Sequence, residues 1–399
     1  MDIRQKLILL SGGVRWLLKD DFNDTVAAGS VNGTLATPTG GARTGVDTNS
    51  KISVGSGVLN FATGEATNDG VWYSQRTRIA GRALVCKVTP SNTSGAIVLG
   101  WDANQSGSVL EFLQFFSNAA IRISGNAGSN LPSVSAYTAT PYTVMGILRT
   151  TGMLWLIKGG AFVNWSLLYP IAQGTGNPFP VLNVGNTVSI FTSDFMRIPQ
   201  NLIYIVPLAS DAFTRANGAP GVTGGGGSEE SGGTGLTWTD QKGVSAIASN
   251  ALTFSSLTTS LGIATVPCGT TNVMVEAVCT RAAGNSGLTL RWTDANNYIA
   301  AYLDGTNLVV VEVVAGTPNT LQTTAVTYGA TKRLIASTNA TKLRFYYGDA
   351  LVGSELTTAV TTGNAHGLYT SDTGATFDNL VVWAKGNGGE YNFLDRYTR

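Results

Sequence analysis

The sequence predicts an all-β protein made of two tandem antiparallel β-sandwich domains behind a short N-terminal arm. Three observations predict this class. Glycine accounts for 49 of 399 residues, or about 12%, against a norm of roughly 7%. Charged residues make up only 12% of the chain. Short apolar segments alternate with turn residues from end to end, and the second half repeats motifs of the first half. Gly and Asn supply the positive φ angles that β-hairpins need.

Strand-like segments follow one another through the first half of the chain. They are short, rich in β-branched and aromatic residues, and bounded by Gly, Asn, Ser or Pro. The expected strands cover residues 57–61, 83–89, 96–101, 109–116, 120–124, 144–149, 153–158, 162–165, 188–191 and 202–206. Nothing between them has the periodicity of a long helix, so this spacing indicates a β-sandwich.

The second half opens with a stretch that resembles the start of the first. Asp211-Ala212-Phe213 echoes Asp20-Asp21-Phe22, and we take Asp21 as the counterpart of Asp211. Four further motif pairs keep the same order. They are Leu59-Asn60-Phe61 with Leu252-Thr253-Phe254, Ser94-Gly95 and Trp101 to Asn104 with Ser286-Gly287 and Trp292 to Asn296, Leu154 to Gly159 with Leu343 to Gly348, and Thr192-Ser193-Asp194 with Thr370-Ser371-Asp372. A period this long indicates a duplicated domain rather than a solenoid repeat.

These matches divide the chain into an N-terminal arm (1–19), a first domain (20–207), a second domain (208–385) and a C-terminal tail (386–399). A Gly-rich stretch at 224–233 has the composition of a flexible linker. It follows the second copy's opening motif, however, so we expect a long loop inside the second domain and a short joint near Pro207.

Both ends of the chain carry apolar residues. In the arm Ile3, Leu7, Leu10, Val14 and Leu17 recur at helical spacing, interrupted at Ser11 to Gly13. A short helix followed by a turn or a strand is expected. The arm either packs on the first domain or docks onto a partner in a larger assembly. The tail has three aromatic residues in seven, so it should pack on a domain or on a neighbouring chain. No apolar run is long enough for a transmembrane helix, and no signal-peptide cleavage site follows the Leu7 to Leu10 run.

The second copy carries three motifs that point to a known fold family. They are the opening Asp-x-Phe, the strand and turn from Leu343 to Val352, and the closing Phe377-Asp378-Asn379-Leu380. Together they resemble the concanavalin A-like, laminin-G-like jelly roll. That resemblance implies two face-to-face antiparallel sheets in which the first and last strands pair. The first copy departs from it, with Phe195 to Gln200 in place of the closing motif.

Low charge, abundant Gly, Thr and Asn, and tandem jelly rolls behind an arm are also similar to bacteriophage virion proteins of the tail, baseplate or head appendages. The resemblance implies a non-enzymatic structural protein that is anchored in the virion by its arm. It also implies that the protein forms a homo-oligomer there. The alternative is a carbohydrate-binding adhesin on a virion or cell surface. Fold alone does not decide between them.

Most chemistries are excluded by what the sequence lacks. The net charge is +1 with no basic block, which argues against nucleic acid or an anionic membrane as a partner. The single histidine, His366, does not make a metal cluster, and no Gly-x-Ser-x-Gly motif is present. Hydrolases of the concanavalin type need carboxylates two residues apart on one strand, whereas most glutamates here stand alone. We therefore expect no enzymatic activity.

Two kinds of binding site have candidates. An aromatic platform with polar rim residues would suit a glycan, but the same tryptophans also suit a core; the residues are Trp101, Asp102, Asn104, Trp292, Asp294, Asn296 and Tyr298. Oxygen ligands for a structural Ca²⁺ are available from Asp21, Asp211 and Asp378, because the fold places the first and last strands side by side. The alternative is that these aspartates cap turns. No other cofactor is expected.

Overall fold

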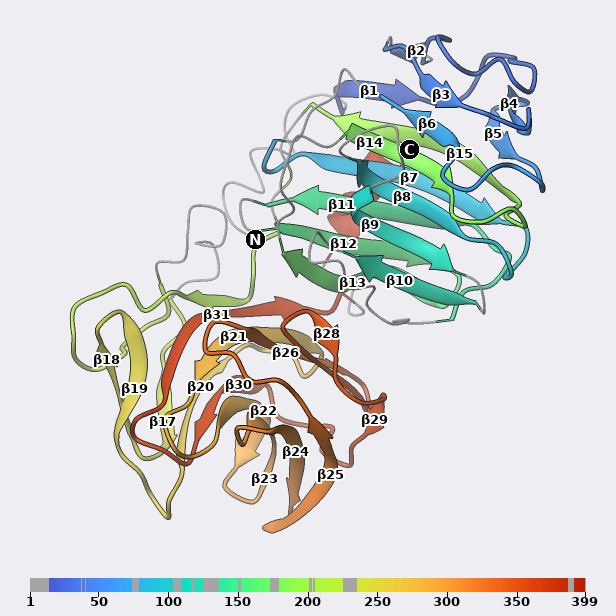
Figure 1. The fold of residues 1–399 in the computed structure, drawn as a ribbon. Helices are drawn as coiled ribbons and strands as arrows, with labels where there is room; N and C mark the ends of the chain where they lie inside the picture. Colours follow the sequence, from blue (N-terminus) through green and yellow to red (C-terminus); the bar gives the residue numbers. More distant parts are fainter. Residues whose placement is uncertain are drawn as a thin grey trace. The chain divides into compact units, whose positions relative to one another are not determined.

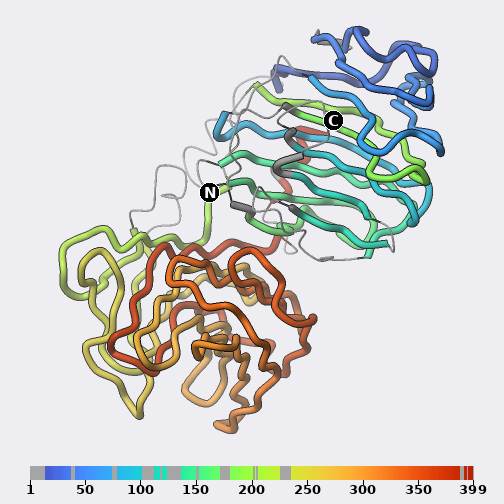
Figure 2. The backbone as a smooth tube through the Cα atoms, viewed as in Figure 1, coloured from blue at the N-terminus to red at the C-terminus, as the bar shows by residue number. Residues whose placement is uncertain are grey.

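A computed structural model describes residues 14–36, 38–39, 41–73, 79–102, 109–116, 119–124, 136–149, 152–172, 179–200, 203, 205–224, 235–386 and 391–398. The chain forms two compact units (Figure 1). The first comprises Met1–Tyr204 together with Gly386–Arg399, and the second comprises Ile205–Lys385. Figure 2 traces the chain out of the first unit, through the second and back. Nothing helical in the described residues is long and apolar enough to cross a membrane.

The first unit contains two antiparallel sheets. The nine-stranded sheet has the spatial order β13 (Phe162–Ala172), β12 (Gly152–Gly159), β11 (Tyr142–Leu148), β7 (Ala83–Pro90), β15 (Phe191–Pro199), β1 (Trp16–Asp20) and β2 (Pro38–Thr39), and the hairpin β4 (Ile52–Gly55) and β5 (Val58–Phe61) joins it at β15. The six-stranded sheet has the order β10 (Ala120–Ser124), β9 (Val109–Phe116), β8 (Ile97–Asp102), β14 (Phe179–Val184), β6 (Gly70–Trp72) and β3 (Thr44–Val46).

The second unit also contains two sheets. A nine-stranded sheet has the order β18 (Val244–Ala248), β19 (Ala251–Ser256), β31 (Thr376–Ala384), β21 (Val273–Thr280), β26 (Arg333–Asn339), β27 (Lys342–Tyr347) and β28 (Ala350–Leu351), with β16 (Ala209–Asp211) on β31 and β29 (Leu356–Thr357) on β27. A seven-stranded sheet has the order β17 (Thr239–Lys242), β20 (Gly262–Pro267), β30 (Ala365–Thr370), β22 (Ser286–Asp294), β23 (Asn297–Leu303), β24 (Asn307–Val314) and β25 (Thr317–Ala325).

The two units repeat one topology, which confirms the all-β sandwich prediction. The order β6-β14-β8-β9-β10 in the first unit corresponds to β20-β30-β22-β23-β24 in the second. Likewise β1-β15-β7-β11-β12 corresponds to β16-β31-β21-β26-β27. The first and last strands of each copy pair antiparallel, β1 with β15 and β16 with β31, as the jelly-roll resemblance implies.

Three of the four later motif pairs fall on equivalent strands, and the fourth does not. The equivalent strands are β5 and β19, β8 and β22, and β12 and β27. Thr192-Ser193-Asp194 lies inside β15, whereas Thr370 ends β30 and Ser371-Asp372 form the turn before β31. This pairing was therefore wrong. Its three residue types suit a turn as well as a strand end, so their identity does not fix their position.

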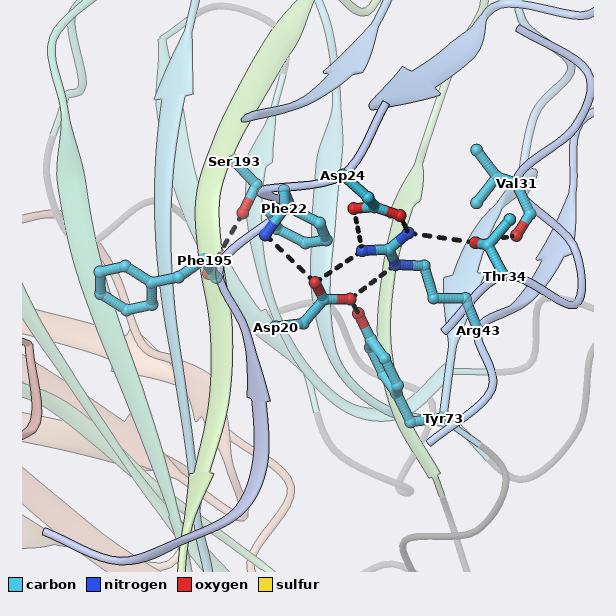
Figure 3. A network of polar contacts seen from close by, with 9 residues as sticks. All are labelled: Asp20, Phe22, Asp24, Val31, Thr34, Arg43, Tyr73, Ser193 and Phe195. Carbon is cyan, nitrogen blue, oxygen red and sulfur yellow. Dashed lines mark hydrogen bonds and ion pairs between the residues drawn. The ribbon is translucent and has the colours of Figure 1, made fainter. Parts of the chain in front are cut away.

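A buried ion-pair network holds the start of the first sandwich together (Figure 3). The Arg43 guanidinium donates two hydrogen bonds to Asp20, of 2.6 and 2.7 Å, and two to Asp24, of 2.6 and 2.8 Å. The Tyr73 hydroxyl donates to Asp20 at 2.6 Å. The Phe22 N–H also donates to Asp20, and Phe22 has a φ of 50°, which is unusual for a bulky residue.

The second unit repeats this arrangement around Asp211. The Arg215 guanidinium donates to both oxygens of Asp211 at 2.6 and 2.9 Å, and the Trp238 indole donates to it at 2.8 Å. The Phe213 N–H donates to Asp211, with Phe213 at a φ of 53°. The counterpart of Asp211 is therefore Asp20, and the expected equivalence with Asp21 was wrong by one residue. Asp21 instead forms ion pairs with Arg197 and Lys19.

The described part of the arm extends the first sandwich. Strand β1 begins at Trp16, inside the range assigned to the arm, and pairs with β15 and β2. Leu17 lies in this strand and is half-buried, as is Val14 just before it. Ile3, Leu7 and Leu10 lie outside the described residues, so their role in an assembly contact stays a prediction.

The Gly-rich stretch is bounded by paired backbone in the second unit. Thr223 N–H donates to Leu236 O at 2.8 Å, and Gly235 N–H donates to Thr223 O at 3.0 Å. Residues 225–234 lie outside the described residues. The flanks that the structure describes therefore close on each other within the second unit, as a loop does.

The C-terminal tail belongs to the first unit. Its 3₁₀ helix η1 (Asn392–Tyr397) lies against β13. Leu394 and Tyr397 are buried, with 0% and 1% exposure. Asp395 accepts hydrogen bonds from Lys158 Nζ at 2.8 Å and from the Trp165 indole at 2.8 Å. Strand β12 carries apolar side chains on both faces. The tail, which bonds to Lys158 of this strand, covers part of the outer face of the sheet.

We expect Asp395→Asn to loosen the tail and to lower the free energy of unfolding of the first unit by about 1–2 kcal/mol, since hydrogen bonds to a charged group are stronger than neutral ones. Chemical denaturation and amide hydrogen exchange in residues 391–398 measure this. Asp194→Asn is the control, because its pair with Lys87 is as exposed as the Lys158–Asp395 pair but has no indole hydrogen bond beside it, so the change should cost under about 1 kcal/mol. Equal effects from the two variants would contradict the tail's role.

Candidate functional site

The glycan candidates of the first unit end β8. Trp101 and Asp102 are the last residues of that strand. Their side chains, and the whole of Asn104, lie outside the described residues. A role for these three residues in binding stays a prediction.

The candidates of the second unit come together at the hairpin of β22 and β23. The Trp292 and Tyr298 rings pack with centroids 4.8 Å apart, and they are only 7% and 5% exposed. Asp294 and Asn296 lie in the exposed turn, where Asp294 accepts the Asn296 N–H at 2.7 Å. Trp292 is thus not an open stacking platform, and Asp294 bonds within its own turn.

A second aromatic pair lies on the same sheet, and the sequence analysis missed it. Tyr302 of β23 and Tyr369 of β30 stack with centroids 5.2 Å apart and an interplanar angle of 16°. Both residues are register partners of Gly287 on the strand between them. A Cβ at Gly287 would lie 2.0 Å from the Ala301 carbonyl oxygen, so this position requires glycine. The alternation of Tyr298, Ala300 and Tyr302 was the available signal.

These aromatic residues lie on the outer face of the seven-stranded sheet. The sandwich core takes the alternate positions of the same strands, including Leu288, Ile299 and Leu368. The aromatic residues form a separate apolar cluster with Ile263, Ala300 and Val313. The members of this cluster are 0–8% exposed, and Tyr302, which packs against it, is half-buried. We call Tyr298, Tyr302, Tyr369 and Trp292 the tyrosine face.

The hydroxyl groups of the tyrosine face make no hydrogen bond among the described residues. Burial raises the pKa of Tyr298, Tyr302 and Tyr369, so all three stay neutral near pH 7. Lys242 lies over the Tyr298 ring at 5.9 Å. Neutral hydroxyls that both donate and accept, set among apolar rings, match the alternating hydroxyl groups and C–H faces of a sugar.

His366 is structural. It is 0% exposed, its Nδ1 accepts the Arg291 N–H at 3.2 Å, and its Nε2 lies 3.0 Å from Thr270 O. Burial lowers the pKa of His366 to about 4. Arg291 is also fully buried and donates to the carbonyl oxygens of Thr271 and Val360. His366 is the second residue of strand β30, just after the loop that precedes this strand.

The calcium candidates are occupied by protein donors. Asp211 is ion-paired with Arg215, which already supplies positive charge at the carboxylate. Burial and the nearby Asp211 charge raise the pKa of Asp378. The described residues contain no group of three or more His, Cys, Asp or Glu arranged to hold a metal ion. Asp21 is paired with Arg197, so its carboxylate also already has a positive partner. Calcium binding at these aspartates stays a prediction.

Glutamates that stand alone in the sequence have structural partners in space. Glu276 accepts the Trp383 indole N–H and pairs with Arg333, and Glu312 accepts from the Thr358 hydroxyl. Glu65 shares a hydrogen bond with Asp47, and burial raises its pKa to about 7. Glu65 also accepts the backbone N–H groups of residues 49, 51 and 66. These carboxylates bind backbone and side chains of the fold.

No family model and no curated protein matches this chain. Among solved structures, the carbohydrate binding module CBM66 from Bacillus subtilis is 17% identical, with 37% of this chain and 95% of that one covered and a TM-score of 0.32. A β-1,3-glucanase from Mycobacterium marinum is 12% identical, with 47% and 99% covered and a TM-score of 0.33. Trypanosoma rangeli sialidase is 14% identical, with 45% and 30% covered and a TM-score of 0.32. These scores are too low to transfer an activity, and none of the three is described as a virion protein.

Proposed function

We propose that this protein binds carbohydrate without cleaving it, and that the tyrosine face of the second unit makes the contact. The observation that supports this most is the set of three tyrosine hydroxyls without a partner in the described residues, on an apolar outer sheet face. Sugar hydroxyls would supply the hydrogen bonds that the described residues do not give to these tyrosines. Since Trp292 and Tyr298 cover each other, the sugar meets hydroxyls and ring edges rather than the flat face of Trp292.

We propose binding without catalysis because the glutamates that the structure describes on the strands are held in hydrogen bonds and ion pairs within the fold. Glycoside hydrolysis needs one carboxylic acid and one free carboxylate flanking the sugar. The glutamates on strands β21 and β24 are bonded to Trp383, Arg333 and Thr358 instead.

We expect the double substitution Tyr302→Phe and Tyr369→Phe to weaken glycan binding about tenfold or more, because it removes two hydroxyl contacts and keeps both rings. A glycan array with the full chain, followed by titration of the strongest ligand, measures this. Tyr347→Phe is the control, since its hydroxyl donates to Gly329 O away from the tyrosine face. Unchanged affinity in the double variant would rule the tyrosine face out.

A structural role in a phage virion is the second proposal, and the two are compatible in a receptor-binding appendage. It rests on the low charge of the chain and on the apolar arm. Because β1 begins at Trp16, deletion of residues 1–13 tests the arm without cutting the first sheet. Under this second proposal the protein forms homo-oligomers in the virion. The alternative location is the cell surface or the extracellular space. Portal, capsid or tail genes beside its own gene would support it.

A further inference from the structure

The outer face of the six-stranded sheet in the first unit carries an unusual row of polar side chains. Direct register partners run across the sheet from Gly70 through Asn183, Val98 and Gln114 to Arg122. Partners in one register row share a face of a sheet. The neighbouring position on β9, Phe115, contacts Tyr142 of the other sheet and therefore faces the core. Asn183, Gln114 and Arg122, which we call the polar row, accordingly face away from the core.

Two amides of the polar row have no protein partner. Asn183 is 0% exposed, and neither its Oδ1 nor its Nδ2 makes a hydrogen bond. Gln114 is 8% exposed, and its side chain makes no hydrogen bond among the described residues. Buried polar groups without a partner are rare in folded proteins, because each one loses its hydration without compensation. Asn183 is therefore an unexplained cost to the fold, whereas the amide atoms of Gln114 are not fully buried.

The third member of the row is an unpaired cation. The Arg122 guanidinium lies over the Phe116 ring, 3.3 Å from its centroid. It forms no ion pair or hydrogen bond with any described residue, and burial lowers its pKa. Arg43 and Arg291, the fully buried arginines, are by contrast held by carboxylates or by carbonyl oxygens. Arg122 thus offers a free positive charge with its stem already ordered.

The corresponding face of the second unit differs. There Thr289 donates its hydroxyl to Leu368 O at 3.3 Å, and Thr265 accepts from Gln241 at 3.0 Å. These two threonines therefore have protein partners, on a face where the hydroxyls of the tyrosine face have none among the described residues. The buried amide of Asn183, unpartnered among the described residues, belongs to the first unit, whereas Thr289 and Thr265 on the corresponding face of the second unit are bonded.

We propose that the polar row binds an acidic oligosaccharide, with a carboxylate or sulfate group on Arg122 and sugar hydroxyls on Gln114 and Asn183. Three strand spacings separate Asn183 from Arg122, which is about 14 Å, so the ligand is longer than one sugar. Arg122, which is half-buried, is the most accessible member of the row, and Asn183, at 0% exposure, is the least accessible. This inference rests on the proposed carbohydrate-binding function but uses a different face and a different unit.

The test titrates the full chain with three tetrasaccharides: one containing hexuronic acid, its sulfated counterpart and a neutral one. We expect an acidic ligand to bind, with an affinity that falls with salt. Arg122→Met keeps the stem over Phe116 and should weaken binding at least tenfold, while Arg122→Lys should retain part of it. Lys51→Met, an exposed cation of the same unit, is the matched control.

Asn183→Leu separates binding from folding. It removes two unpartnered polar atoms at similar volume, so the melting temperature should stay unchanged or rise while affinity for the acidic ligand falls about fivefold or more. Equal affinity of the wild type and Arg122→Met for every acidic ligand would overturn the inference. Neutral binding that is lost only in the Tyr302→Phe, Tyr369→Phe variant would leave the proposed function standing and the polar row refuted. Acidic binding that survives this double variant but is lost in Arg122→Met would support the polar row alone.

Discussion

Asp20→Ala is expected to lower the free energy of unfolding of the first unit by about 3–5 kcal/mol, since it leaves a buried guanidinium without its main counter-ion. Both side chains of the Arg43–Asp20 pair are 0% exposed. Burial alone lowers the pKa of Arg43, but the hydrogen bonds to Asp20 and Asp24 outweigh it and hold the pKa above its ordinary value. The substitution also leaves the Tyr73 hydroxyl and the Phe22 N–H without their acceptor.

Chemical denaturation of the full chain measures this loss, and hydrogen exchange in β1 and β15 assigns it to the first unit. The double variant Asp20→Ala, Arg43→Met should be less destabilised than Asp20→Ala, because it removes a buried guanidinium that Asp24 alone would have to compensate. Asp194→Ala, which breaks a part-exposed pair with Lys87, is the control. A loss under about 1 kcal/mol in Asp20→Ala would show that the network is dispensable.

Acidification from pH 7 to pH 4 is expected to cost the second unit about 3 kcal/mol through His366 alone. Burial lowers the pKa of His366 to about 4 in the folded state, against an ordinary value of 6.5. Between pH 6.5 and pH 4, His366 binds a proton in the unfolded chain but stays neutral in the folded chain. Stability from this group is therefore fully present above pH 6.5 and is lost as the pH falls through 4. Protonation would also place a second cation beside Arg291.

His366→Gln isolates this effect, because the carboxylates titrate in both proteins. Its stability should vary less between pH 7 and pH 4 than that of the wild type, by about 3 kcal/mol. Since the sequence contains one histidine, an NMR titration of the imidazole reports this site directly. A measured pKa near 6.5 would contradict the buried, neutral state.

Local patterns in the sequence determined the class of the fold and its duplication. Alternating apolar residues with Gly and Asn at turns predict strands, because side chains alternate across a strand with a period of two. Leu59 and Phe61, like Leu252 and Phe254, lie inside equivalent buried strands. The opening Asp-x-Phe motif was recognisable for the same reason: its hydrogen bond spans only two residues.

The position of each functional group depended on partners far away in the chain. The Asp-x-Phe spacing aligns Asp20 with Asp211, but the partner of Asp20, Arg43, lies 23 residues on, and no local pattern reveals it. Tyr302 and Tyr369 meet only because β22 places Gly287 between their strands. The return of the tail to Lys158 spans 237 residues.

The sequence by itself therefore determined strands, turns and the repeat, since these follow from neighbouring residues and their periodicity. The tertiary structure alone decided which polar groups find partners and which do not. Asn183, Gln114 and Arg122 look unremarkable in the sequence, and each is polar within an apolar strand. Only sheet register brings them into one row and shows that the described protein leaves them unpaired, because hydrogen-bond satisfaction is a property of the packed structure.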